Sequence, residues 1–270
     1  MKIAVCLSGK FTGKNDRGDI QGFEEPYNYL YENIIKNNDV DIYIHGWDDD
    51  PEATKKLIEL YKPKKHLVEK QIVFEHPHSD YDFKNYQSLP SDTTTQLLLQ
   101  NIYSRFNSNK KVTDLIEGDY DFVLLTRFDS IFFEPFLFNG LNNEHFYVSN
   151  WWANKNGYGF NDAWFMSSKD NIIKFTEIYD NLDNYMDLNS DYYDYLVRYG
   201  LNEKNLHSAH CITRFHTEKH INNIHGLGLE HVTWNLLRRI NNRRNPWWSP
   251  KFDLHKPNPN LSILEKRFRW

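Results

Sequence analysis

The stretch Tyr120-Asp121-Phe122-Val123-Leu124-Leu125-Thr126-Arg127-Phe128-Asp129 decides the fold, because a run of apolar residues ends in two ionisable side chains. Continuous apolar residues over 122–125 are typical of a strand buried on both faces, as in a parallel sheet covered by helices. Burying Arg127 and Asp129 beside such a strand costs free energy unless they meet a partner, a metal or a ligand. In open α/β sheets, ligands bind outside the carboxyl ends of the strands. We therefore expect a binding site where this strand ends.

The pattern on either side of this strand predicts an α/β fold with a mixed, mostly parallel sheet flanked by helices. Short apolar runs that predict strands alternate with segments of helical spacing. The expected strands are 3–7, 41–45, 65–74, 122–125, 146–152 and 163–167. The expected helices are 26–37, one opening at Pro51, 93–106, 171–182, 192–199 and 229–240.

Length and composition favour one domain with an extension. The 270 residues are 40% hydrophobic and 16% aromatic, which is ample for a core. We expect a single domain over 1–240 and a basic, aromatic C-terminal extension over 241–270, helical or irregular in structure. Residues 238–270 hold nine Lys/Arg and two acids, a net charge of +7, which leaves −12 for the rest of the chain.

This charge distribution argues against nucleic-acid binding, because most of the chain is acidic. The basic extension favours either packing against the domain or peripheral contact with an anionic membrane surface. No run approaches the roughly 20 apolar residues of a membrane span, and no signal peptide opens the chain. The two cysteines form no CxxC motif. A cytoplasmic location is the resulting expectation.

Four segments, in this order, resemble a family of polysaccharide glycosyltransferases with the GT-A fold, known from bacteria and viruses. They are Val5-Cys6-Leu7-Ser8-Gly9, Asp41-Ile42-Tyr43-Ile44-His45-Gly46-Trp47, Gln96 on a helix, and Tyr120 to Asp129. The resemblance covers about residues 1–170. It implies transfer of a sugar from a nucleotide diphosphate sugar, with UDP favoured, to a hydroxyl of a glycan acceptor. It also implies a nucleotide-sugar half over 1–135 and an acceptor half over 136–240.

The same resemblance implies that residues at the strand ends bind the nucleotide sugar. Ser8, Gly9 and Lys10 would line the nucleotide pocket, with Gly9 permitting close approach of the backbone and Lys10 pairing with a phosphate. His45 and Trp47 would contact the base or ribose, and Gln96 would join them. The alternatives are an ordinary strand-ending turn with a solvated lysine, and aromatic side chains that close the edge of the sheet.

Arg127 and Asp129 occupy the place of the DxD motif, whose last acid binds a divalent cation that bridges the diphosphate in such enzymes. The implied metal is Mn²⁺ or Mg²⁺ on Asp129. Arg127 stands where an acid is usual, and its guanidinium can bind phosphate with two hydrogen bonds. Strict dependence on metal is therefore in question. The alternative for Arg127 is a structural salt bridge to a nearby acid.

Asp162 is the candidate catalytic base. It follows the glycine loop Gly157-Tyr158-Gly159-Phe160-Asn161 and precedes an apolar run. In inverting enzymes of the GT-A type an acid in such a setting deprotonates the acceptor hydroxyl, which must lie within hydrogen-bond reach. Asp162 could instead cap a turn or bind the acceptor without proton transfer.

Five histidines crowd the segment that ends at His225: His207, His210, His216, His220 and His225 itself. Two pairs have helical spacing, but a single Cys, Cys211, accompanies them and no HExxH motif is present, so a zinc site is not favoured. Because enzymes of the GT-A type often take a later histidine as a metal ligand, His225 is the candidate for that role. An ordinary surface or core histidine is the alternative.

Two rival functions remain open from the sequence. A sugar- or nucleotide-binding protein that kept the GT-A fold and lost catalysis would explain the altered DxD motif. A nucleotidyltransferase acting on sugar phosphates is disfavoured, since no glycine-rich, basic loop for a nucleoside triphosphate follows the first strand. The sequence leaves the oligomeric state undefined.

Overall fold

The structure is a computed structural model. It describes residues 1–13, 19–20, 22–75, 95–136, 138–149, 159–227, 234–236, 239–240 and 243–244. Residues 19–20, 95–96, 204 and those from 234 onward are described by their backbone alone. The basic, aromatic extension predicted for 241–270 thus lies outside the described residues, except for the backbone of 243–244.

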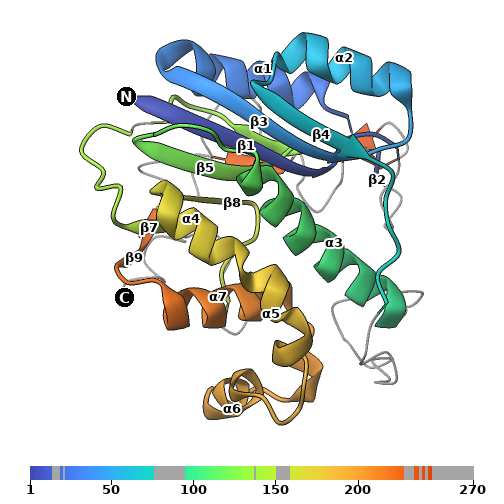
Figure 1. The fold of residues 1–270 in the computed structure, drawn as a ribbon, viewed down its shortest axis with the longest axis vertical. Coiled ribbons are helices and arrows are strands. Elements are labelled where there is room, and N and C mark those ends of the chain that lie inside the picture. Colours follow the sequence, from blue (N-terminus) through green and yellow to red (C-terminus); the bar gives the residue numbers. More distant parts are fainter. Residues whose placement is uncertain are drawn as a thin grey trace.

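A seven-stranded mixed sheet forms the centre of the molecule, in the order β4-β3-β1-β5-β8-β7-β9 (Figure 1). Strands β4, β3, β1 and β5 run parallel, β8 is antiparallel to β5 and to β7, and β9 is parallel to β7. The predicted α/β fold with a mostly parallel mixed sheet is confirmed. The bounds are Lys2–Lys10 (β1), Asp39–Trp47 (β3), Lys65–Glu69 (β4), Phe122–Arg127 (β5), Phe146–Ser149 (β7), Trp164–Ser167 (β8) and Ile224–Leu227 (β9).

Strand β5 is buried on both faces, as its apolar run predicts. Phe122, Val123, Leu124 and Leu125 are each at most 2% exposed. Alternate side chains enter two different cores, because successive residues of a strand point to opposite faces of the sheet. Val123 and Leu125 join one core, whereas Phe122 and Leu124 join the other. Each face of the sheet therefore needs its own cover of helices.

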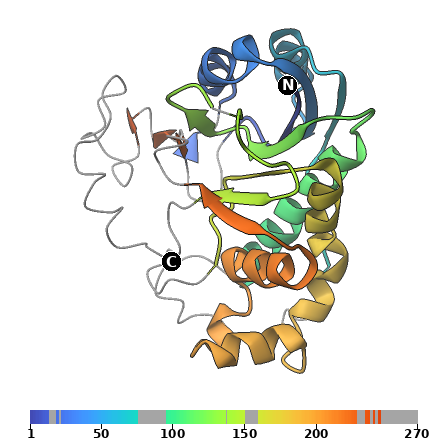
Figure 2. The same ribbon diagram turned by 90° about the vertical axis from the view of Figure 1, so that its left-hand side faces the viewer.

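The helices divide between the two faces, as Figure 2 shows. Helices α1 (Glu24–Asn33) and α2 (Pro51–Tyr61) cover one face through Leu30, Leu57 and Tyr61. The other face carries α3 (Thr95–Asp114), α4 (Lys169–Thr176), α5 (Ile178–Tyr185), α6 (Asp191–Arg198) and α7 (Ala209–His220). Two 3₁₀ turns, η1 (Ile35–Asn37) and η2 (Glu203–Asn205), complete the helical elements of the described chain.

Several predicted bounds differ from the structure, three of them substantially. The strand expected over 65–74 ends at Glu69, and the helix expected over 93–106 continues to Asp114. The helix expected over 171–182 divides at Glu177 into α4 and α5. The Thr176 hydroxyl donates to the Ile173 carbonyl at 2.9 Å and so competes with the backbone ladder just before the break.

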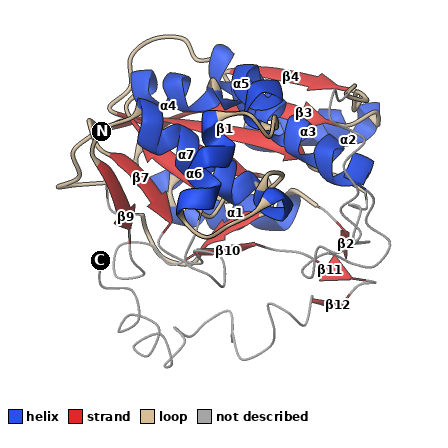
Figure 3. Ribbon diagram, turned by 90° about the horizontal axis from the view of Figure 1, so that it is seen from below, coloured by secondary structure: helices blue, strands red, loops and turns tan. Residues whose placement is uncertain are grey.

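The helix predicted over 229–240 is wrong for the residues described there. Trp234–Leu236 is strand β10, antiparallel to β6 (Ser130–Phe132), and Arg239–Ile240 is strand β11. Strand β11 lies between β2 (Asp19–Ile20) and β12 (Arg243–Arg244), as Figure 3 shows. Pairing with distant segments overrides the local helical spacing, since β10 pairs with β6, the one partner that β6 has among the described strands.

Within the described ranges, no helix combines the length and the apolar character needed to cross a bilayer. The two cysteines, Cys6 and Cys211, are buried free thiols. Burial raises the pKa of both.

Candidate active site

The carboxyl ends of three neighbouring strands bring most of the predicted site residues to one edge of the sheet. In the parallel register Ser8 lies between His45 of β3 and Arg127 of β5, and Gly9 lies beside Gly46. Asp129 follows β5 in a turn, and Asp162 lies just before β8, whose first residue pairs with Thr126. Residues that are more than 100 positions apart in the chain thus meet at the edge where α/β sheets bind ligands.

Arg127 and Asp129 form a side-on ion pair. Arg127 Nε donates to Asp129 Oδ1 at 2.7 Å, and Nη2 donates to Oδ2 at 2.8 Å. The Asp129 side chain is 5% exposed and that of Arg127 is 18% exposed, so the pair is largely shielded from water. The structural salt bridge considered for Arg127 is therefore present. Both oxygens of the candidate metal ligand contact the guanidinium.

Asp162 lies on the open side of this pair. Its Oδ2 is 3.8 Å from Arg127 Nη1, beyond hydrogen-bond distance, and its side chain is 23% exposed. Burial alone would lower the pKa of Arg127, but the charges of Asp129 and Asp162 raise it above its ordinary value. The guanidinium therefore stays charged, and its Nη1 edge faces the more accessible carboxylate.

Two residues of α3, which the sequence patterns did not single out, complete the cluster. Arg105 donates from Nη1 to the Ser8 hydroxyl at 3.2 Å and from Nη2 to the Asp162 carbonyl at 2.5 Å. The Ser8 hydroxyl donates to Asn109 Oδ1 at 2.7 Å. Ser8 is 1% exposed, so its hydroxyl serves this network beneath the site. Arg105 joins the end of β1 to the segment that carries Asp162.

Gly9 and Lys10 form the accessible part of the β1 end. Gly9 has φ +109°, and a Cβ built there would meet open space. The left-handed backbone favours glycine at this position, and the space above it admits a ligand to the main chain. Lys10 is exposed. These placements are compatible with the nucleotide-binding roles that the resemblance implies for both residues.

His45 and Trp47 face the interior. Their exposed fractions are 0% and 2%. Ser108 and Glu69 lie 2.7 Å from Nδ1 and 3.1 Å from Nε2 of His45, and the Trp47 indole donates to the Ser104 carbonyl at 3.4 Å. Both side chains serve packing between β3 and α3, which matches the alternative in which aromatic groups close the sheet.

His225 and Asp129 are not brought together. His225 lies on β9, separated from β5 by β7 and β8, and its ring stacks on His145 at a centroid distance of 4.0 Å. The side chain of Gln96 lies outside the described residues, although its backbone belongs to α3. Neither residue adds a described side-chain contact to the cluster around Arg127.

The described residues do not fit a resident Mn²⁺ or Mg²⁺ as they are arranged. Such cations need several oxygen ligands, of which carboxylates are the strongest. Asp129 has both oxygens on Arg127, and the described residues contain no group of three His, Cys, Asp or Glu side chains able to hold a metal ion. A cation on Asp129 would lie against the positive charge of Arg127, which opposes its binding.

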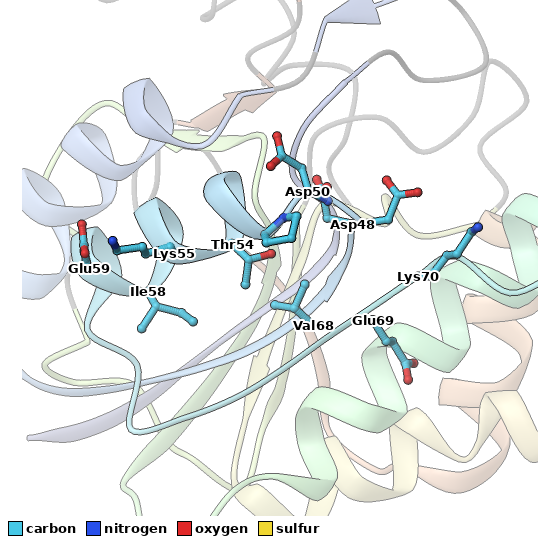
Figure 4. Close-up of a pocket in the computed structure, with 11 residues that line it drawn as sticks. Asp48, Asp50, Thr54, Lys55, Ile58, Glu59, Val68, Glu69 and Lys70 are labelled. Carbon is cyan, nitrogen blue, oxygen red and sulfur yellow. Dashed lines mark hydrogen bonds between the residues drawn. The ribbon is translucent and has the colours of Figure 1, made fainter.

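An open groove of about 590 Å³ lies between α2 and the end of β4 (Figure 4). Its walls carry Asp49, Lys55, Glu59 and Lys70, with Ile58 and Val68 among the apolar side chains. Asp50 in its rim caps α2 by accepting from the backbone of Glu52 at 2.9 Å. None of the predicted site residues lines this groove, so it carries no role in the chemistry proposed below.

Comparison of the sequence with protein-family models and with curated proteins finds no match. Among solved structures, the apo form of the glycosyltransferase GlyE of Streptococcus pneumoniae TIGR4 matches over 82% of this chain with 11% identity and a TM-score of 0.40. A second structure of GlyE matches over 82% with 15% identity and a TM-score of 0.41. The apo form of mouse xyloside xylosyltransferase 1 matches over 84% with 10% identity and a TM-score of 0.39.

This chain spans 44% and 45% of the two GlyE chains and 84% of the xylosyltransferase chain. At identities of 10–15% and TM-scores of 0.39–0.41, these similarities assign no family, donor or acceptor to this chain.

Proposed function

We propose that this protein transfers a sugar from a nucleotide diphosphate sugar to a hydroxyl of a glycan acceptor, with inversion at the anomeric carbon. The observation that carries the proposal is the juxtaposition of Asp162 and Arg127 at the carboxyl edge of the sheet. It places a partly exposed carboxylate, suited to accept a proton, beside a guanidinium that stays charged. Inverting transfer from a diphosphate donor uses a base for the acceptor hydroxyl and a positive charge beside the leaving group.

Each residue then has a defined task. Asp162 accepts the proton of the acceptor hydroxyl while that oxygen bonds to the anomeric carbon of the donor. The bond from this carbon to the diphosphate oxygen breaks, and the nucleoside diphosphate leaves with the electron pair. Arg127 and Lys10 stabilise the charge that develops on the leaving group. Asp129 holds Arg127 through its two hydrogen bonds, and Gly9 admits the donor to the backbone.

The finer assignments belong to the proposal as well. UDP is the favoured nucleotide, by the sequence resemblance. Mn²⁺ or Mg²⁺ on Asp129 would lie against the positive charge of Arg127, and no step above depends on a metal. The two buried free thiols are compatible with a cytoplasmic location.

A panel of nucleotide sugars, assayed for transfer and for slow donor hydrolysis, tests this function. Asp162→Asn should lower kcat by about 10²- to 10⁴-fold, because it removes the base and keeps the size of the side chain. Asp170→Asn is the matched control, since Asp170 is an exposed acid in the first turn of α4. Full activity in folded Asp162→Asn would refute the assigned role.

The binding protein without catalysis is the second candidate, and the Arg127–Asp129 pair favours it. This pair fills with a salt bridge the place of an acidic metal-binding motif. Calorimetry with the same panel separates the two functions. A nucleotide sugar that binds and is neither hydrolysed nor transferred, with or without Mn²⁺, identifies the binding protein.

A further inference from the structure

The segment that carries Asp162 is joined to the start of α7 by two reciprocal hydrogen bonds. The backbone N–H of Phe160 donates to the His210 carbonyl at 3.1 Å. His210 Nδ1 lies 2.8 Å from the Phe160 carbonyl and donates to it, since a carbonyl only accepts. The side chain and the backbone of His210 thus hold one residue, two positions before the candidate base.

Gly159 fits this contact and admits no side chain. Its φ is +93°, and a Cβ would lie 2.7 Å from the carbonyl carbon and Cβ of His210. These atoms belong to the first turn of a helix and cannot move aside easily. The backbone at Gly159 therefore lies directly against α7.

Two further contacts extend the connection. The Arg214 guanidinium, one turn along α7, lies 5.9 Å above the Phe160 ring. On the other side of Asp162, the Thr126 hydroxyl donates to the Ala163 carbonyl at 3.2 Å. The short segment 159–163 is thus held at one end by α7 and at the other by β5, with Asp162 between them.

We infer that His210 is a positioning residue that fixes Asp162 relative to Arg127 through its hydrogen bond to Phe160. The inference rests on the proposed function, because positioning matters for activity only if Asp162 is the base. The 3.8 Å separation of Asp162 from Arg127 depends on where the backbone of 159–163 lies. Of the two bonds that hold this backbone to α7, only the one from Nδ1 requires a particular side chain.

Three variants test the inference. His210→Ala removes the side-chain donor, and His210→Asn restores a donor near the position of Nδ1. His220→Ala is the matched control, since His220 is an exposed histidine at the other end of α7. We expect kcat to fall about tenfold in His210→Ala with the donor KM nearly unchanged, and to recover to within about threefold in His210→Asn.

Backbone hydrogen exchange supplies a readout that needs no activity. The bond from the Phe160 N–H to the His210 carbonyl remains available in every variant, so its exchange rate reports the order of the segment itself. We expect faster exchange over 159–163 in His210→Ala, and wild-type exchange in His210→Asn and His220→Ala.

The outcomes separate the inference from the proposed function. Unchanged exchange in His210→Ala overturns the positioning role, whatever the activity. Faster exchange with an unchanged kcat overturns the link to catalysis. If the wild-type protein turns over no donor, the proposed function fails, and the exchange data still decide whether His210 fixes the segment that holds Asp162.

Discussion

The guanidinium of Arg127 contacts the buried carboxylate of Asp129 and faces that of Asp162. This arrangement predicts a strong energetic coupling between Arg127 and Asp129. Arg127→Met leaves the Asp129 side chain, 5% exposed, without its guanidinium and should lower the free energy of unfolding by about 3–5 kcal/mol. Asp129→Leu should lower the free energy of unfolding by a similar amount. The double variant should recover at least about 1 kcal/mol relative to the sum of the two losses, because it removes both charges.

Urea unfolding of the wild type, the two single variants and the double variant at neutral pH measures this coupling. Losses that simply add in the double variant would show that the side-on pair contributes nothing beyond its two separate side chains. Glu32→Gln, at an exposed pair with Lys36 in α1, is a control in which a change of no more than about 0.5 kcal/mol is expected.

The position of Arg127 and Asp129 at the end of a buried strand could be predicted, because ionisable residues beside apolar strands need a partner or a ligand. The 3.8 Å approach of Asp162 to Arg127 could not be predicted from its loop setting. Arg105 could not be predicted in this way. It lies within a helix whose apolar spacing gives no indication of a site, and its contacts are with Ser8 and Asp162, 97 and 57 positions away. The burial of His45 could not be predicted, since a polar residue at a strand end can also be a buried partner of a helix.

The close packing at the junction of β1 and β3 depends on the absence of a side chain at Gly46. A Cβ on Gly46 would lie 2.6 Å from the ring of Phe11, which is fully buried and packs on Phe23 and Phe128. Gly46→Ala should therefore push the ring from its place and lower the free energy of unfolding by about 1–3 kcal/mol. Thermal and urea unfolding measure the loss.

Gly22→Ala is the matched control, because its added Cβ would meet an atom of Glu24 at an ordinary 3.7 Å. We expect the control to lie within about 0.5 kcal/mol of the wild type. Equal stability of both variants would mean that Phe11 moves aside without cost, and that the end of β1 is held by other contacts.

The buried strands of the first half were predictable because they are continuous apolar runs, whereas helix α7 was not predictable. Six of its residues are buried, and three of these are Thr213, His216 and Thr217. Burial of polar side chains conceals the apolar period on which a sequence prediction depends. The end of α3 was missed for the same reason, since Asn107, Ser108 and Asn109 are buried there.

Two buried histidines make the stability of the folded protein depend on pH. His45 and His216 are both 0% exposed. Burial lowers the pKa of each to about 4, despite hydrogen bonds that favour the charged form. His216 joins α5 to α7 by accepting from the Tyr185 hydroxyl at 2.8 Å, and its Nε2 donates to the Lys174 carbonyl at 2.8 Å. Its neutral form therefore belongs to the folded helical layer.

The sign of the effect follows from proton binding. Between pH 6.5 and about 4 the unfolded chain binds a proton at each histidine and the folded chain does not. The contribution of the two neutral histidines to the free energy of unfolding is therefore fully present above pH 6.5. It is lost as the pH drops toward 4, by about 3 kcal/mol for each histidine. Urea unfolding across this range should show the fall. In His216→Gln, which cannot titrate, the fall should be about half as large, even though the variant starts from a lower stability above pH 6.5. An identical pH dependence in the variant and the wild type would mean that burial does not lower the pKa of His216 in the folded protein.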